Sequence, residues 1–538
     1  EVVGIKVQTV KMSEKGEAML KFRLKALPKL GAKELVFMAE SVKDNTKTAR
    51  MPYTLSLRPS TPYDSRFAMG FERSEYKLSG IETLYDEYRV QQVSASVSPL
   101  VLASGLLKYL NKYPHVCTEQ TISKVFPAME VFFKYPELVK NMDIYALFDD
   151  AMLKLRERQT INGGFTTWNV SGVVAADPFY SVYAAHFLVK AREHNFNVPE
   201  NMLQKALAYC EEQAGRTPDG INDIVPAYAA YVLTLSGRVT TSYLLNLEEY
   251  YKDNYAKNWK ESLNASFMAA GYALLQDNAK ARSLAGQYKY GASGDIADDA
   301  ANIYLMASYF PNDFGALRED NVKTLLKPLN SGAFNTISSA YAVLALNAFS
   351  NEEDDKNIHF SGSQPQYTPF PTVDFNASSQ GLTVTSEKPF YYVVAQQGFP
   401  RQDKTAPFAE GMEVSKKVYD KAGNEVSKAG LGDELIVKIT YRGLRRDAVS
   451  DVALVDLLPG CFEVVDNSLE MDWNTDSSEI RDDRVISYVT AGREAHEISY
   501  RVKVIAEGNF VLPPVYASAM YLPLVRANSA SGTIKSGE

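Results

Sequence analysis

The middle of the chain carries a recurring pattern in which a tyrosine lies beside small residues. The pattern occurs at Tyr183-Ala184-Ala185, Tyr228-Ala229-Ala230, Gly271-Tyr272-Ala273 and Tyr341-Ala342, and the first three tyrosines are 45 and 44 residues apart. A period of this length is typical of a repeated pair of helices. Small residues let paired helices approach closely, and the tyrosine fills the space between them. Residues 98–350 are therefore predicted to form stacked helix pairs, and a stack that closes on itself is an α/α toroid.

The sequence before these helices has the character of β-strands. Between residues 19 and 25, apolar side chains alternate with mostly basic ones, which is the pattern of a half-buried strand. Three further stretches are predicted strands: 2–10, 34–39 and 53–57. The segment 58–62 contains two prolines and is predicted to be an extended hinge, because proline biases the preceding residue away from helix.

Beyond residue 350 the chain returns to β-type sequence. The acidic run 352–355 is predicted to be a solvated exit loop. Residues 382–394 hold two predicted strands that lie too close to the helices to make a domain of their own. Residues 403–538 are predicted to form a separate β-sandwich, because apolar and polar side chains alternate along 435–442 and along 498–504.

The composition limits the classes of function. A chain of 538 residues exceeds one hydrophobic core, so three or four domains are expected. A net charge of −8 disfavours a nucleic-acid surface. The three cysteines are too scattered for a disulfide framework or a zinc site, and the five histidines form no pair at metal-ligand spacing. No cofactor is expected, and no stretch approaches the ~20 apolar residues of a membrane helix.

One short segment carries reactive chemistry. Cys117-Thr118-Glu119-Gln120 places a thiol three positions before a primary carboxamide. On the first turn of a helix, positions i and i+3 are neighbours. The sulfur of Cys117 can then reach the δ-carbon of Gln120, expel ammonia and close an internal thioester, which is a stored acyl donor. The alternative interpretation of Cys117 is a small buried residue near a helix start.

The sequence around this segment resembles the thioester segment of bacterial alpha-2-macroglobulins, a family that traps proteases. The resemblance rests on residues 113–121, which read YPHVCTEQT, and on Phe126-Pro127 after them. One position departs from the family, which usually has Gly immediately before the Cys where this chain has Val116. Glycine permits backbone angles that valine adopts less readily, so we expect Val116 to bear on how efficiently the thioester forms.

The resemblance implies an architecture for the whole chain. The thioester domain of the family is an α/α toroid inserted into a split β-domain of the kind called CUB. Residues 1–97 then hold the end of a macroglobulin-like domain and the first half of the CUB-like domain, and residues 351–402 hold its second half. Residues 403–538 resemble the terminal macroglobulin domain, a β-sandwich. Family members are several times larger and carry a protease bait upstream, so this chain is expected to be a fragment of a longer exported protein.

A stored thioester needs a dry cover, because water would hydrolyse it. Met520-Tyr521, followed five residues later by Arg526, resembles the pattern with which bacterial macroglobulins cover the thioester from the terminal domain. The resemblance implies that Tyr521 is the cover and that Met520 and Arg526 belong to the same lid. The alternative is that Met520 and Tyr521 are ordinary residues of the sandwich.

Two side chains near the motif are candidates for assisting the chemistry of Cys117 and Gln120. Glu119 either orients the Gln120 amide or is solvated, and His115 invites a general-base role because histidine titrates near neutral pH. Some vertebrate thioester proteins use a histidine from the rim of the toroid, and we find no match for it here. His186 is predicted to be a packed core residue. Without an acyl-transfer histidine, the thioester is expected to prefer amines over hydroxyls.

Two pairs of adjacent carboxylates invite an enzymatic interpretation. Asp149-Asp150 and Asp298-Asp299 are of interest because many glycan-cleaving enzymes use two carboxyl groups on an α/α toroid. Adjacent residues on a helix point in different directions. Both pairs are therefore predicted to be solvated helix termini.

These features predict part of a bacterial alpha-2-macroglobulin-like protease inhibitor, not an enzyme, that traps proteases through a Cys117–Gln120 thioester. The expected partners are target proteases, attached through lysine amines, and small amines such as methylamine. The expected location is the periplasm or the cell surface, with membrane contact only through an anchor outside this chain. One alternative is a thioester surface adhesin, which would lack a lid. The other is a toroid enzyme acting on polysaccharide, which would be indifferent to loss of Cys117.

Overall fold

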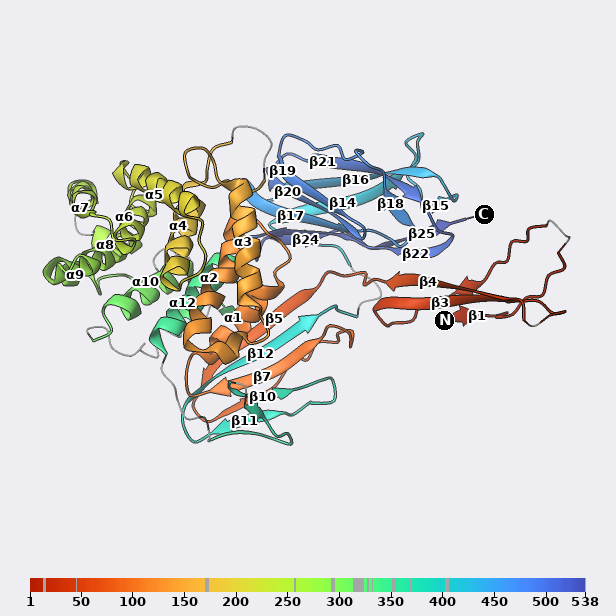
Figure 1. Cartoon of the computed structure of the whole chain (residues 1–538), viewed down its shortest axis with the longest axis horizontal. Coiled ribbons are helices and arrows are strands. Elements are labelled where there is room, and N and C mark those ends of the chain that lie inside the picture. The colour runs from red at the N-terminus through yellow and green to blue at the C-terminus, as the bar shows by residue number, and fades with distance from the viewer. Residues whose placement is uncertain are drawn as a thin grey trace.

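The computed structural model of the chain has a helical ring, a β-domain beside it and a C-terminal β-sandwich (Figure 1). The structure describes residues 1–12, 16–44, 46–169, 174–255, 258–291, 296–312, 324–326, 329–330, 332–350, 355, 357–367, 369–401 and 406–537. The predicted exit loop 352–355 therefore lies almost entirely outside the described residues.

The N-terminal strands form two small sheets. β3 (Gly31–Glu40) and β4 (Thr48–Leu57) pair as an antiparallel hairpin that projects from the rest of the molecule (Figure 1). The predicted strands at 34–39 and 53–57 lie within these two strands and are confirmed.

The two earlier strand predictions are largely wrong. Only β1 (Val2–Val3) and β2 (Arg23–Leu24) are strand there, and they pair with each other. The alternation along 19–25 would bury one face only if a second layer covered it. Instead Met19 is 86% exposed and Leu24 is 45% exposed, so both faces of this segment meet solvent.

Strands from both sides of the helical region share one sheet. β12, which follows the helices, lies between β5 and β7, which precede them, and is antiparallel to both. The neighbours in this sheet are β5 (Asp64–Glu72), β12 (Phe390–Gly398), β7 (Val90–Ser96), β10 (Pro371–Asp374) and β9 (Gln366–Tyr367). A second, smaller sheet consists of β6 (Glu75–Lys77), β11 (Thr383–Ser386) and β8 (Ile358–Phe360). The helices are thus an insertion within one β-domain.

Eleven helices of the described residues build the ring. They are α1 (Val101–Lys112), α2 (Thr118–Lys134), α3 (Ile144–Arg158), α4 (Pro178–Glu193), α5 (Glu200–Gly215), α6 (Val225–Leu235), α7 (Thr241–Tyr255), α8 (Leu263–Leu274), α9 (Asn278–Leu284), α10 (Ile296–Tyr309) and α12 (Thr336–Phe349). Contacts run from α2 through α4, α6, α8 and α10 to α12, and α12 contacts α2 again. These six inner helices therefore close a toroid, as the sequence predicted.

The repeated tyrosines lie in the core of this ring. Tyr183, Tyr228 and Tyr341 are almost fully buried on α4, α6 and α12, and the Tyr341 hydroxyl donates to the Tyr228 hydroxyl at 3.0 Å. His186 Nδ1 lies 2.9 Å from the same Tyr228 hydroxyl, and its side chain is buried. The prediction that His186 is a packed core residue is confirmed.

The C-terminal part is a β-sandwich. One sheet consists of β13 (Phe408–Glu410), β24 (Arg526–Asn528), β23 (Val515–Ala519), β17 (Val449–Leu457), β20 (Arg484–Ala491) and β19 (Thr475–Arg481). The facing sheet consists of β14 (Met412–Tyr419), β16 (Glu434–Gly443), β21 (His496–Val504) and β18 (Phe462–Val464). A third, small sheet consists of β15 (Lys428–Ala429), β25 (Gly532–Ser536) and β22 (Gly508–Leu512). Buried and partly exposed residues alternate along β16, as its sequence predicted.

Candidate functional site

The thiol and the carboxamide meet at the start of α2. Cys117 is the N-cap residue, with φ −61° and ψ 174°, and Gln120 occupies the third helical position. The Gln120 backbone N–H donates to Cys117 Sγ at 3.4 Å, and the Cys117 backbone N–H donates to Gln120 Oε1 at 3.1 Å. This reciprocal pair is a capping box in which Cys takes the place of Ser or Thr. Both side chains are buried and lie at the same helix end.

Val116 is accommodated without the backbone conformation that favours glycine. Its φ is not positive, and its side chain is 36% exposed. Its carbonyl oxygen accepts hydrogen bonds from the Arg158 guanidinium at 2.9 Å and from the Thr121 hydroxyl at 3.3 Å. The backbone ahead of Cys117 is thus held by two side chains of the ring.

Arg158, at the end of α3, clamps this segment. Besides Val116, its guanidinium contacts the Thr118 hydroxyl at 3.5 Å and donates to the Asn169 side-chain oxygen at 2.7 Å. The Thr118 hydroxyl in turn donates to the Thr166 carbonyl at 2.6 Å. Nothing in the sequence predicted this clamp, because Arg158 is distant from the motif and carries no local pattern.

Two residues of the sandwich contact the reactive groups. The Tyr521 hydroxyl lies 3.5 Å from Cys117 Sγ, and Gln120 Nε2 donates to Met520 Sδ at 3.2 Å. Met520 and Tyr521 directly follow β23. The structure therefore brings two of the three predicted lid residues, Met520 and Tyr521, to the thiol and the carboxamide, although about 400 positions separate the two segments.

A β-bulge in β17 helps to position the lid residues Met520 and Tyr521. The Met520 backbone N–H donates to the Asp451 carbonyl at 2.9 Å. Asp451 has φ +55° and lies where the pairing of β17 with β20 shifts between Val449 and Val452. A bulge of this kind bends a strand and redirects its neighbours. From the ring, the Asn335 amide contacts the Tyr521 carbonyl at 3.4 Å.

Glu119 is a buried carboxyl group beside the thiol. It accepts hydrogen bonds from the hydroxyls of Ser123 at 2.5 Å, Thr336 at 2.7 Å and Tyr521 at 2.8 Å. Burial raises the pKa of Glu119 to about 7, although these three hydrogen bonds work in the opposite direction. Burial also raises the pKa of the Cys117 thiol. Glu119 is therefore a proton acceptor near neutral pH, linked to the thiol through the Tyr521 hydroxyl.

His115 does not face the thiol or the carboxamide. Its Nδ1 lies 2.9 Å from the hydroxyl of Tyr488 on β20, and Trp168 stacks on the same tyrosine with ring centroids 4.1 Å apart. Burial lowers the pKa of His115 to about 4, so the imidazole is neutral at physiological pH. These contacts make His115 part of the interface between ring and sandwich, and they give no support to a general-base role.

Arg526 lies away from the lid. It is exposed on β24, where its guanidinium donates to Glu410 at 2.9 Å and lies 5.5 Å from the ring centroid of Phe408. Both partners belong to β13, the edge strand that pairs with β24. These contacts hold the side chain at the exposed edge of the sheet, so the structure does not bring Arg526 to Cys117 or Gln120.

The two acidic pairs differ from each other. Asp149 and Asp150 are exposed on α3, and Asp150 pairs with Lys154 at 2.5 Å. Asp299 is only 4% exposed and accepts hydrogen bonds from the Tyr288 hydroxyl at 2.8 Å and the Gly291 N–H at 3.0 Å. The prediction of solvated helix termini is therefore wrong for Asp299, because Tyr288 and Gly291 cover it. Asp149 and Asp150 are solvated as predicted, but they lie in the middle of α3 and not at its end.

Neither a metal site nor a membrane span is found in the part of the chain that the structure describes. Its acidic, histidine and cysteine side chains form no cluster of three or more suited to a metal ion. Its helices are all too short or too polar to cross a membrane.

Comparison of the sequence with known families identifies one domain. Residues 411–523 match the bacterial alpha-2-macroglobulin MG10 domain. The chain is 28% identical, over 98% of its length, to the alpha-2-macroglobulin homolog of Yersinia pestis, and 29% identical, over 99% of its length, to the alpha-2-macroglobulin of Rickettsia conorii. It spans 29% and 30% of those two proteins, which is less than a third of each.

Comparison of the structures gives the same result. The chain superposes over its full length on native alpha-2-macroglobulin from Escherichia coli spanning MG7 to the C-terminus, with a TM-score of 0.81, 18% identity and 92% of that chain covered. It also superposes on Salmonella alpha-2-macroglobulin reacted with methylamine, with a TM-score of 0.79, 20% identity and 38% of that chain covered. At these identities the likeness shows the fold. The predicted fold class and the predicted resemblance are both confirmed.

Proposed function

We propose that this chain, a relative of the bacterial alpha-2-macroglobulins, stores an internal thioester between Cys117 and Gln120 and uses it to couple covalently to amines. One observation carries the proposal. The thiol and the carboxamide cap the same helix reciprocally, and the Tyr521 hydroxyl and the Met520 sulfur contact them from the sandwich.

Closure of the bond follows from these contacts. Cys117 Sγ attacks the δ-carbon of Gln120, the sulfur–carbon bond forms, and the carbon–nitrogen bond breaks. The Cys117 N–H, 3.1 Å from Gln120 Oε1, stabilises the oxyanion that develops on this oxygen. The thiol proton leaves with the amide nitrogen, so ammonia is the only other product.

Glu119 carries that proton in this proposal. Tyr521 donates its hydroxyl proton to the Glu119 carboxylate at 2.8 Å, and its oxygen lies 3.5 Å from Sγ. The hydroxyl can therefore take the thiol proton as it gives up its own. A carboxyl group with a pKa of about 7 accepts this proton and returns it to the departing nitrogen at neutral pH.

Storage of the bond depends on the exclusion of water. Met520 and Tyr521 pack with Ile486, Tyr488 and Trp168 in an apolar cluster that covers the helix start from the sandwich side. Removal of this cover exposes the acyl carbon. An amine then attacks it, the carbon–sulfur bond breaks, and the sulfur takes a proton from the attacking nitrogen. The chain ends with an amide at Gln120 and a free thiol at Cys117, so each molecule reacts once and is not an enzyme.

In the whole protein we propose that this reaction traps proteases. Protease cleavage of an upstream bait would loosen the contact between sandwich and ring, and a lysine amine of the protease would then attack Gln120. The lid contacts of Met520 and Tyr521 favour a triggered trap over a surface adhesin, which has no need of a lid. A protein with this task acts outside the cytoplasm, in the periplasm or at the cell surface.

Intact mass tests the proposal. A formed thioester makes the chain lighter by one ammonia, and methylamine then adds its own mass and releases one titratable thiol. Cys117→Ala is the matched control and should show neither change. A wild-type chain at full sequence mass, unreactive to methylamine from the start, would contradict the proposal.

A further inference from the structure

A cavity of about 470 Å³ lies at the end of the ring where the inner helices begin. Its lining includes Asp177 at the start of α4, Ile224 at the start of α6 and Asn335 at the start of α12. Tyr521 and Leu522 of the sandwich border it as well. The cavity is thus shared between ring and lid, and the thioester mechanism proposed above makes no use of it.

The lining combines aromatic rings with carboxylates. Phe179, Tyr180, Phe267 and Tyr341 contribute aromatic surface from the ring, and Asp177 and Asp298 contribute two acidic groups. Among the described residues that line the cavity there is no Lys, Arg or His. Aromatic faces and carboxylates together attract a cation that carries an alkyl group.

The cavity adjoins the reactive groups through a single side chain. Tyr521 borders the cavity, and its hydroxyl lies 3.5 Å from Cys117 Sγ. Tyr180, which also lines the cavity, has its ring centroid 6.4 Å from that of Tyr521. A molecule in the cavity is therefore separated from the thiol by the ring of one tyrosine.

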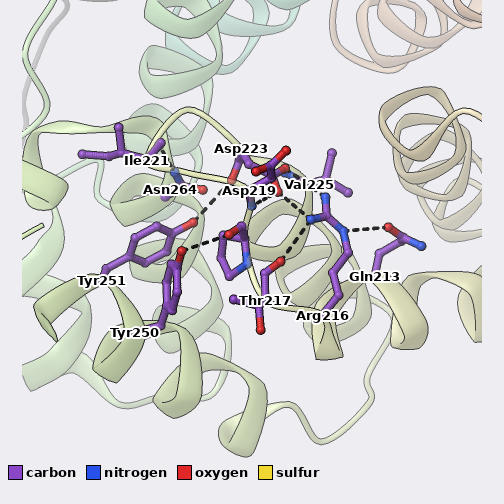
Figure 2. Close-up of polar contacts among 11 residues, drawn as sticks. Gln213, Arg216, Thr217, Asp219, Ile221, Asp223, Val225, Tyr250, Tyr251 and Asn264 are labelled. Atoms are coloured by element: carbon purple, nitrogen blue, oxygen red, sulfur yellow. Dashed lines mark hydrogen bonds and ion pairs between the residues drawn. The ribbon is translucent and has the colours of Figure 1, made fainter. Parts of the chain in front are cut away.

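One wall of the cavity is fixed by a network of polar contacts. Figure 2 shows the loop between α5 and α6, where the Arg216 guanidinium pairs with both oxygens of Asp223 at 2.6 and 3.0 Å. From neighbouring helices, the Tyr250 hydroxyl donates to the Pro218 carbonyl at 2.9 Å and the Asn264 amide donates to the Ile221 carbonyl at 2.8 Å (Figure 2). Ile224 follows this loop directly, so its wall is preorganised for binding.

We propose that this cavity binds the ammonium group of the incoming nucleophile, either a small alkylamine or the side chain of a lysine, before it passes Tyr521. The inference rests on the proposed thioester function and names the chemical class that the site selects. When the Tyr521 cover leaves, the bound ammonium gives one proton to the Glu119 carboxylate. The neutral nitrogen then attacks the Gln120 acyl carbon, the carbon–sulfur bond breaks, and Cys117 takes the second proton from nitrogen.

The competing ligand class is an anion, because several helices begin around the cavity and helix N-termini attract negative charge. Asp177 and Asp298 already place negative charge at the starts of α4 and α10. A further anion would meet these carboxylates. The cation is therefore the occupant that the charges favour.

Binding is tested on the full chain with Cys117→Ala, which cannot form a thioester. n-Butylamine, which is the lysine side chain without its backbone, is titrated by calorimetry or NMR at about pH 7, with n-butanol as the uncharged control. We expect n-butylamine to bind with a Kd on the order of 1 mM and n-butanol to bind at least about threefold more weakly. Equal binding of the two, or binding of inorganic phosphate in their place, would overturn the inference.

Variants assign this binding to the cavity. Asp177→Asn keeps the side-chain oxygen that caps α4 but removes the charge. The variant should weaken the binding of n-butylamine about threefold or more, and Asp298→Asn should do the same. Asp149→Asn, at an exposed position on α3, is the matched control and should leave the binding unchanged. Unchanged binding in both cavity variants would show that the ligand lies elsewhere.

The reaction itself separates the two proposals. Wild type and Asp177→Asn are reacted with n-butylamine and with hydroxylamine, which is uncharged near neutral pH. We expect the ratio of the two rates to fall about fivefold in the variant, through a higher half-saturating concentration of n-butylamine. A wild-type chain that reacts with neither reagent contradicts the thioester function alone. If wild type and Asp177→Asn both react and show the same ratio of n-butylamine rate to hydroxylamine rate, the cavity is not the ammonium site.

Discussion

The two halves of the candidate site are held in different ways. The half on α2 is fixed inside one domain, where Arg158 and Thr118 tie the backbone before the helix and Thr336 binds Glu119. The half on the sandwich consists of Met520 and Tyr521, which reach the site through a few side-chain contacts across a domain boundary. The first half is built to stay in place, and the second half is able to leave.

For the proposed thioester, this difference implies that formation and storage of the bond depend largely on different parts of the molecule. Changes on the α2 half should affect whether the bond forms and how fast it reacts. Changes on the sandwich half should affect how long it lasts, except that the Tyr521 hydroxyl also takes part in closure. The four predictions below test this division, and the largest effect is expected on the α2 half.

Glu119→Gln should have the largest effect. The variant keeps a side chain of similar shape but cannot accept a proton, so both closure of the thioester and its reaction with methylamine should slow about a thousandfold. In the wild type the rate should rise as the pH rises through about 7, where Glu119 loses its proton. A variant with the wild-type rate and the same pH profile would remove Glu119 from the mechanism. Intact mass over time measures both steps.

Arg158→Ala should prevent most of the chain from forming the bond. The substitution removes one of the two donors to the Val116 carbonyl, the donor to the Asn169 side chain and a buried side chain that is only 6% exposed, which destabilises the domain by about 2 kcal/mol. Arg158→Lys retains the charge but not the guanidinium group with its several N–H donors. Its stability and its fraction of formed bond should therefore lie between those of Arg158→Ala and the wild type. Thermal unfolding measures the stability, and the fraction lighter by one ammonia measures the bond.

Protonation of His115 should loosen the sandwich from the ring. Its pKa is about 4 when buried against Tyr488 and about 6.5 when free, so the docked state is fully favoured above pH 6.5 and loses stability as the pH falls from about 6.5 to about 4. The loss should reach about 3 kcal/mol, at 1.36 kcal/mol for each unit of pKa. The positive charges of Arg481 and Arg484 also lower the pKa of His115, so they add to the loss of stability when His115 is protonated.

His115→Gln is the control for this pH effect, because glutamine can still contact the Tyr488 hydroxyl and does not titrate. In this variant the contribution of His115 should be absent, so the docked state should no longer gain stability as the pH rises from about 4 to about 6.5. Glu119 acts in the opposite direction, since its raised pKa makes the folded state lose stability as the pH rises from about 4.5 to about 7. A wild type and variant with parallel pH profiles would contradict the assignment to His115.

Tyr521→Ala should shorten the lifetime of the formed thioester in water about tenfold, because the acyl group loses its aromatic cover. Tyr521→Phe keeps the ring and should preserve the lifetime better while slowing closure, since the hydroxyl that links Cys117 to Glu119 is absent. Arg526→Ala is the matched control from the same segment. Its exposed pair with Glu410 is worth less than about 1 kcal/mol, so the lifetime should stay the same.

The sequence predicted the local half of the site better than the distant half. The spacing of Cys117 and Gln120 was sufficient to predict that their side chains lie close together, because backbone geometry alone makes residues three positions apart neighbours at the start of a helix. The lid residues were found only through a resemblance, since no local pattern links position 521 to position 117. Arg158, Thr336 and Tyr488 were missed for the same reason, because each acts on the site through tertiary contacts.

The fold shows the same limit. The toroid followed from the spacing of Tyr183, Tyr228 and Tyr272, which reports the repeat of helix pairs. The alternation along 19–25 did not produce a half-buried strand, because alternation predicts a face to cover but does not supply the layer that covers it. The residue boundaries proposed for the four regions remain a prediction.

The pairing of β5 with β12 has a mechanical consequence. Asp64, where the chain enters this sheet, is directly opposite Gly398, where the chain leaves it toward the sandwich. Tension applied between the N-terminal hairpin and the sandwich would therefore peel these two strands apart from that corner, one residue pair at a time. The helical ring lies in the chain between the far ends of the strands, so this load would reach the ring only through its contacts with the sandwich, such as those of Tyr521 with Cys117 and Glu119.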